Sequence, residues 1–79
     1  MSTKKGIFMN EAYIFSKNLK ELRIQYGYTQ KYVSEKIGVK YQSYQAYELG
    51  ISLPSYLNLI KLADFFDVSL DYLAGRKEY

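Results

Sequence analysis

Apolar side chains recur along the chain at the spacing of an α-helix. In the first such segment they fall at offsets of 0, 4, 7 and 11, which places them on one helix face, with polar residues opposite. These residues are Phe15, Leu19, Leu22 and Tyr26. Gly27 follows, as is typical of the left-handed residue that ends a helix. We therefore predict a first helix that ends at Gly27.

A second, short helix is predicted after this glycine. Thr29 is a favourable N-cap residue, and Val33 and Ile37 form an apolar pair four residues apart. The small Ser34 lies between them, and Gly38 ends the segment after about two turns.

The third predicted helix begins near Lys40 or Tyr41 and ends at Gly50. Tyr44 and Tyr47 lie three residues apart, and we expect both rings in the core with their hydroxyls reaching its rim. The side expected to face solvent carries Tyr41, Gln42 and Gln45.

Two more helices complete the chain. Pro54 and Ser55 mark the start of the fourth, and Ser69 and Gly75 bound the short fifth. The expected inward residues are Tyr56, Leu59, Ile60, Ala63 and Phe66, followed by Leu70 and Leu73. No segment alternates apolar and polar residues over the length of a strand, so the fold class is all-α with five helices.

The 79 residues suffice for one domain. We expect it over residues 11–75, before a polar tail (residues 76–79). The N-terminal arm (residues 1–10) is expected to be flexible or, through Ile7 and Phe8, to pack on the core or on a second subunit. The chain has no cysteine and no histidine, which removes the usual zinc ligands and the commonest general base. We therefore expect no enzyme activity, cofactor, metal or small-molecule ligand.

Charge is distributed unevenly. Residues 1–40 carry eight basic and three acidic side chains, whereas residues 41–79 carry three basic and five acidic ones. A basic half suggests a face for a polyanion, although an ordinary solvated surface would look the same. No stretch approaches the roughly 20 apolar residues of a membrane span, and no secretory signal is evident, so we expect no membrane partner and a cytoplasmic location.

Two short helices joined by a tight glycine turn are typical of the helix-turn-helix, whose second helix lies in the DNA major groove. The string TQKYVSEKIGVKYQSYQAYELG resembles this motif in the Cro and repressor (XRE) family, and LPSYLNLIKLADFFDVSLDYLAG resembles that family's fourth and fifth helices. The resemblance runs from about Phe15 to Gly75. It implies a five-helix, lambda-repressor-like domain that binds double-stranded DNA, commonly as a homodimer on a palindromic operator.

The resemblance also implies roles for single residues. Gln30, at the start of the second predicted helix, matches a family residue whose amide contacts a phosphate. The alternative is that Gln30 is a plain exposed residue at a helix start. Gln42 is the first choice for a base contact, because a glutamine amide pairs with adenine. Tyr41 either contacts DNA or shields the helix. The full expected DNA-binding set is Gln30, Lys40, Tyr41, Gln42, Ser43 and Gln45.

Arg23 and Glu48 match a partly buried pair of the family, which implies a structural salt bridge between the first and third helices. Ala46, Leu49 and the loop Ile51-Ser52-Leu53 depart from the family pattern, since they lack the polar or basic residues that often contact DNA there.

The sequence therefore favours a sequence-specific transcriptional regulator, of repressor type, that binds operator DNA through the helix near residues 41–48. The alternative is a protein-interaction module of antitoxin or adaptor type, whose apolar patch would include Leu49, Ile51 and Leu53.

Overall fold

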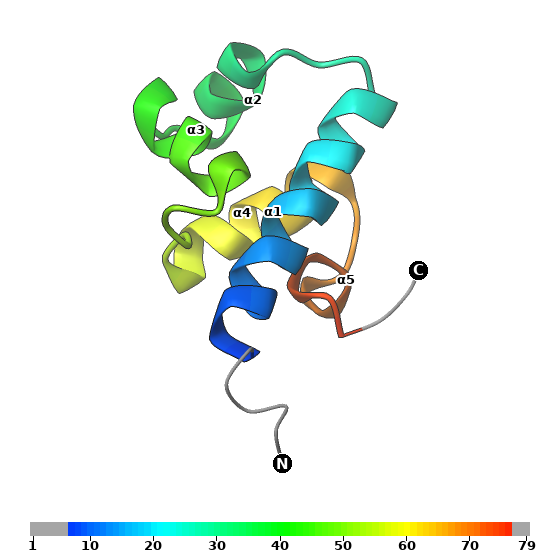
Figure 1. The fold of residues 1–79 in the computed structure, drawn as a ribbon. Coiled ribbons are helices and arrows are strands. Elements are labelled where there is room, and N and C mark those ends of the chain that lie inside the picture. The colour runs from blue at the N-terminus through cyan, green and yellow to red at the C-terminus, as the bar shows by residue number, and fades with distance from the viewer. Residues whose placement is uncertain (1–6, 77–79) are drawn as a thin grey trace.

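The computed structural model describes residues 7–76, with side chains from Ala12 onward. This part of the chain forms five helices and no strand, which confirms the expected fold class: α1 (Ile7–Gln25), α2 (Gln30–Ile37), α3 (Tyr41–Leu49), α4 (Tyr56–Phe66) and α5 (Leu70–Ala74). The long α1 lies against α3 and α5, and α2 packs on α3 and α4 (Figure 1). None of these described helices is long and apolar enough to cross a membrane.

Helix α1 begins earlier than the apolar spacing predicted. Its first residue is Ile7, so residues 7–10 of the expected arm have a helical backbone. No glycine or proline lies between Gly6 and Gly27, so no helix breaker in this stretch would make the helix start later. The rest of the arm, and residues 77–79 of the expected tail, lie outside the described residues.

Local capping sets the other helix boundaries. The hydroxyls of Thr29, Ser55 and Ser69 each accept a hydrogen bond, 3.0–3.2 Å long, from the backbone N–H three residues further on. Each bond satisfies a donor that the first helical turn leaves unpaired. The predicted helix starts at these three residues are confirmed, and so are the predicted glycines after four of the helices: Gly27, Gly38, Gly50 and Gly75.

All five helices contribute to one core. Its buried apolar residues are Phe15, Leu19, Leu22, Val33, Ile37, Tyr44, Tyr47, Leu62, Ala63, Phe66 and Leu73. The burial of both tyrosines confirms the prediction for α3. The predicted face of α4 was partly wrong, because Tyr56 is 72% exposed whereas Leu62 is fully buried. The inward face runs through Leu59, Leu62, Ala63 and Phe66, and Tyr56 lies at its margin, in the first turn of the helix.

An aromatic cluster joins the end of α1 to α2 and α4. Tyr26, Tyr28, Tyr32, Phe65 and Phe66 form a chain of ring contacts with centroids 4.8–6.4 Å apart. The Tyr26 hydroxyl also donates a hydrogen bond of 3.0 Å to the carbonyl of Phe66. Tyrosine therefore serves here as a packing residue with a polar end that reaches backbone or solvent.

Candidate nucleic-acid interface

A three-residue turn, Gly38 to Lys40, joins α2 to α3. Gly38 has φ 73° and ψ 36°, in the left-handed region that glycine adopts without the steric cost of a Cβ atom. The N–H groups of Gly38 and Val39 donate to the last turn of α2, at 3.3 and 3.0 Å. Lys40 then takes the N-cap position of α3 with an extended backbone. The turn thus sets two short helices at a fixed angle, as a helix-turn-helix requires.

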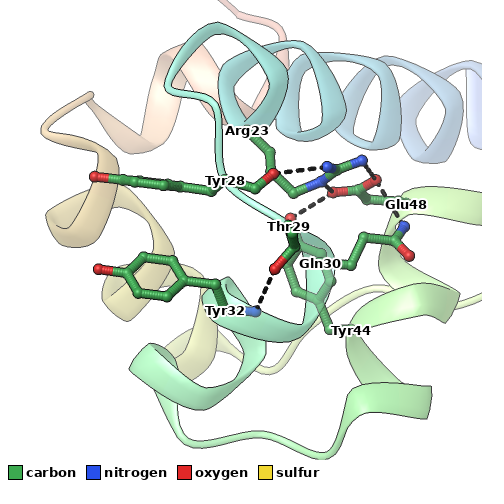
Figure 2. Close-up of polar contacts among 7 residues, drawn as sticks. All are labelled: Arg23, Tyr28, Thr29, Gln30, Tyr32, Tyr44 and Glu48. Atoms are coloured by element: carbon green, nitrogen blue, oxygen red, sulfur yellow. Dashed lines mark hydrogen bonds and ion pairs between the residues drawn. The ribbon is translucent and has the colours of Figure 1, made fainter.

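Behind the turn, Arg23 of α1 forms a two-pronged ion pair with Glu48 of α3 (Figure 2). Arg23 Nε donates to Glu48 Oε2 at 2.7 Å, and Nη2 donates to Oε1 at 2.9 Å. A third donor, Nη1, reaches the carbonyl of Tyr28 in the α1–α2 connection at 2.9 Å. The side chains of Arg23 and Glu48 are only 13% and 2% exposed. Because a bidentate pair fixes both distance and orientation, it holds α3 against α1 and the start of α2.

Two further side chains complete the shell around the Glu48 carboxylate. Tyr44, one turn earlier in α3, donates its hydroxyl to Oε2 at 2.5 Å. Gln30, the first residue of α2, donates its amide N–H to Oε1 at 3.0 Å. The carboxylate therefore accepts four hydrogen bonds from three helices, and we call these four residues, Arg23, Gln30, Tyr44 and Glu48, the brace. No buried side-chain polar atom in the described part of the chain lacks a hydrogen-bond partner.

Each ionisable group of the brace keeps its ordinary charge at neutral pH. Burial alone would raise the pKa of Glu48, but the hydrogen bonds from Arg23, Tyr44 and Gln30 outweigh it and lower the pKa below its usual 4.5. The bond to Glu48 raises the pKa of the Arg23 guanidinium. Burial, and then the bond to Glu48, raise the pKa of Tyr44 above its usual 10.0. None of these groups is poised for proton transfer near pH 7, so the brace is a structural device.

The start of α3 is the part of the helix most open to solvent. Lys40, Tyr41 and Gln42 are exposed, and Ser43 and Gln45 are half-buried. These five predicted DNA-binding residues therefore lie close together in the chain, between the N-cap of α3 and its second turn. Gln30 is the first residue of α2 rather than a residue of α3. Its amide is hydrogen-bonded to Glu48, so it is not the plain exposed residue of the alternative interpretation.

The sequence interpretation missed the role of Tyr44. Its hydroxyl was expected at the rim of the core, but it points inward to Glu48 and the residue is fully buried. The reason is helical geometry, since residues four apart lie on the same side of a helix. That spacing, together with the expected burial of Glu48, was the signal available in the sequence.

Comparison with known proteins shows which family this chain resembles. A family model described as helix-turn-helix matches residues 19–73, more than half of the chain. Among curated proteins, the chain is 47% identical over 60 residues to the HTH-type transcriptional regulator YqaE of Bacillus subtilis, covering 76% of this chain and 52% of that protein. It is 44% identical over 48 residues to the cryptic phage CTXphi transcriptional repressor RstR of Vibrio cholerae, covering 61% and 43%.

A third relative, the HTH-type transcriptional regulator ImmR of Bacillus subtilis, is 40% identical over 62 residues, which cover 78% of this chain and 49% of that protein. The chain thus spans about half the length of these relatives. Among solved structures, the solution structure of the SOS-response transcriptional repressor LexA from Eubacterium rectale matches with a TM-score of 0.80 and 29% identity, covering 82% of this chain and 69% of that one. The chain belongs to the helix-turn-helix family of the Cro and repressor (XRE) type.

Proposed function

We propose that the chain is a sequence-specific DNA-binding transcriptional regulator, of repressor type, that binds operator DNA through α3. The observation that carries the proposal is the contrast along α3 between buried and accessible side chains. Tyr44 and Glu48 are buried and hydrogen-bonded within the brace, whereas the start of the helix carries lysine, tyrosine, glutamine and serine side chains that are exposed or half-buried. The names of the relatives, which are transcriptional regulators and phage repressors, support the same role.

In the proposed complex, α3 lies in the major groove with its N-terminal residues at the base edges. We assign the base contact to Gln42, because its exposed amide can pair with N6 and N7 of adenine. Tyr41 contacts a thymine methyl group or a phosphate. Lys40, at the helix start, neutralises a phosphate, and Ser43 and Gln45 reach base edges or flanking phosphates.

Gln30 is assigned a phosphate contact that depends on the brace. One N–H of its amide is held by Glu48 Oε1 at 3.0 Å, and the amide has a second N–H to offer. Since the bond to Glu48 fixes the amide before DNA arrives, little side-chain entropy is lost when the second N–H meets a phosphate oxygen. The N-terminus of α2 adds a favourable dipole for the same anion.

We further propose that two copies bind a palindromic operator. A two-fold symmetric dimer presents two recognition helices to two half-sites about 34 Å apart, which is one turn of DNA. The family is one of DNA-binding regulators, and the brace holds no group ready for proton transfer. Neither observation favours an enzyme.

The test is selection of bound sequences from a random DNA pool, followed by fluorescence titration of the selected duplex at several salt concentrations. We expect an enriched palindrome and an affinity that falls steeply with salt, with a log–log slope of about −0.9 for each phosphate neutralised. Absence of binding to any duplex even at about 50 mM salt would overturn the proposal and favour the protein-interaction module.

A further inference from the structure

The two oxygens of the Glu48 carboxylate are each shared between Arg23 and one other donor (Figure 2). Oε1 accepts from Arg23 Nη2 at 2.9 Å and from the Gln30 amide at 3.0 Å. Oε2 accepts from Arg23 Nε at 2.7 Å and from the Tyr44 hydroxyl at 2.5 Å. A carboxylate has about four lone-pair sites, so these bonds occupy all of them. A turn of the carboxylate away from one donor therefore alters its bonds to the others.

Among these donors, Tyr44 is the one that the core holds most firmly. The residue is fully buried, and its ring packs edge-to-face on that of Tyr47, with centroids 6.1 Å apart. The hydroxyl lies at the end of a rigid ring that has only two side-chain torsions. Gln30, by contrast, is half-buried at the start of α2, and the last torsion of a glutamine side chain is broad. Tyr44 is therefore the fixed member of the brace, and Gln30 is the member that needs fixing.

The bond from Tyr44 decides how the Glu48 carboxylate is turned. The last torsion of a glutamate is also broad, so the backbone of α3 alone does not fix the direction of the two oxygens. Residues four apart lie on the same side of a helix, and the Tyr44 hydroxyl meets Oε2 from within α3. With Oε2 held there, Oε1 faces the first residue of α2 and accepts from Gln30. The direction of the Gln30 amide thus depends on a hydroxyl group in another helix.

Loss of the Tyr44 hydroxyl would release this arrangement. Oε2 would keep only the bond from Arg23, and the Glu48 carboxylate could turn about its last torsion. The Gln30 amide would lose a fixed acceptor and would have to be ordered when a phosphate arrives. Ordering one flexible side chain at an interface lowers the affinity by about two- to tenfold.

We propose that Tyr44 is a positioning residue for DNA binding: its hydroxyl fixes the Glu48 carboxylate, which in turn fixes the Gln30 amide for a phosphate of the DNA backbone. The inference rests on the proposed function, since it concerns the phosphate contact assigned to Gln30. A buried tyrosine of the recognition helix then sets a contact made by the preceding helix. Contacts from α2 and α3 therefore keep a fixed spacing on the DNA.

The first experiment is NMR relaxation of the side-chain amide nitrogens in the full chain without DNA. In the wild type, Gln30 should have an order parameter close to that of rigid backbone, about 0.85, and the exposed Gln25 a value below about 0.6. In Tyr44→Phe, which keeps the ring, the Gln30 value should fall toward that of Gln25. Tyr47→Phe is the matched control, because Tyr47 is a buried tyrosine of the same helix whose hydroxyl accepts from Asn58 of α4 at 3.4 Å. It should leave the Gln30 value unchanged.

The second experiment is fluorescence titration of the selected operator and of random DNA. Tyr44→Phe should lose about two- to tenfold in affinity on both, because a phosphate contact carries no sequence information. The salt slope should stay the same, because a neutral amide releases no counterion. In the Gln30→Ala background, Tyr44→Phe should cost nothing further. A loss of stability alone would instead lower the affinity by the same factor in both backgrounds. Tyr47→Phe should bind as the wild type does, and circular dichroism at the titration temperature should show each variant folded.

Three results would overturn the role of Tyr44 alone. One is a Gln30 amide in the wild type that is as mobile as that of Gln25, which decides the matter whether or not Tyr44→Phe folds. The others are an unchanged Gln30 order parameter in Tyr44→Phe, and an equal loss of affinity from Tyr44→Phe with and without the Gln30 amide. In each case the wild type still binds its operator and the proposed function stands. A wild type that binds no duplex overturns the proposed function, and the role of Tyr44 falls with it.

Discussion

The buried and the exposed residues of α3 differ in where their polar groups find partners. Tyr44 and Glu48 are buried, and their oxygens are bonded to one another, to Arg23 and to Gln30. Tyr41 and Gln42, at the start of the helix, are exposed. Changes at the buried residues should therefore cost stability, because they leave buried groups unpaired, whereas changes at the exposed residues should alter DNA recognition alone.

The largest effect is expected from Glu48→Gln. This change leaves Arg23, whose side chain is 13% exposed, without its counter-charge. We expect the free energy of unfolding to fall by about 3–5 kcal/mol in urea denaturation. Glu21→Gln is the matched control, since the Lys17–Glu21 pair is about half exposed on both sides and four residues apart; it should cost at most about 0.5 kcal/mol. Similar losses in both variants would show that the brace stabilises no more than a surface pair.

Acid should remove part of the same stability. The pKa of Glu48 is lower in the folded chain than its usual 4.5, so the unfolded chain takes up the proton first. The stabilisation from Glu48 is then fully present above pH 4.5 and is lost as the pH falls through the folded pKa. Urea titrations between pH 7 and about pH 2 should show the wild type converging on Glu48→Gln at the acid end. A constant difference between the two curves would contradict the lowered pKa.

A smaller loss is expected from Tyr44→Phe, which keeps the ring in the core and removes only the hydroxyl that donates to Glu48 at 2.5 Å. A hydrogen bond to a charged group contributes about 1.5–3 kcal/mol, and we expect a loss in that range by thermal or urea unfolding. Tyr13→Phe, at a tyrosine that is 62% exposed, should be neutral. If Tyr44→Phe is equally neutral, the brace reduces to the Arg23–Glu48 pair.

The residues that could be predicted from the sequence are those that act locally. Thr29 caps the helix that it precedes, and Gly38 and Gly50 adopt left-handed backbone angles that most other residues avoid. The residue type alone therefore predicts a helix boundary at each of these positions. The apolar pair Val33 and Ile37 is equally local, because its spacing alone puts both residues on one helix face.

The features that could not be predicted depend on which elements meet. The direction of the Tyr44 hydroxyl and the bond from Gln30 follow from the position of Glu48, which only the packing of three helices determines. The prediction that Tyr56 faces the core of α4 was wrong and Leu62 was missed, because the pattern contains more apolar residues than one face can hold. The Arg23–Glu48 pair was reached only through the family resemblance, since 25 residues separate the two.

Among the exposed residues of α3, Gln42→Ala tests DNA recognition separately from stability. If the amide pairs with a base, fluorescence titration should show a loss of about 1–3 kcal/mol on the selected operator and almost none on random DNA. The free energy of unfolding should not change, because Gln42 is exposed. Gln25→Ala, at an exposed glutamine that ends α1, should affect neither measurement. Equal losses on operator and random DNA would make Gln42 a backbone contact.

The smallest effect is expected from Lys40→Ala, which tests whether this exposed lysine contacts a phosphate or a base. Lys40 is the N-cap of α3 but makes no side-chain capping bond, so its loss leaves the helix start as it was. As a phosphate contact it should weaken binding to operator and random DNA alike, and it should reduce the magnitude of the salt slope by about 1. A loss confined to the operator, with an unchanged slope, would mean that the lysine reads a base. Gln42 and Lys40 would then both contact bases, and the cation that contacts the phosphate backbone would have to come from another residue.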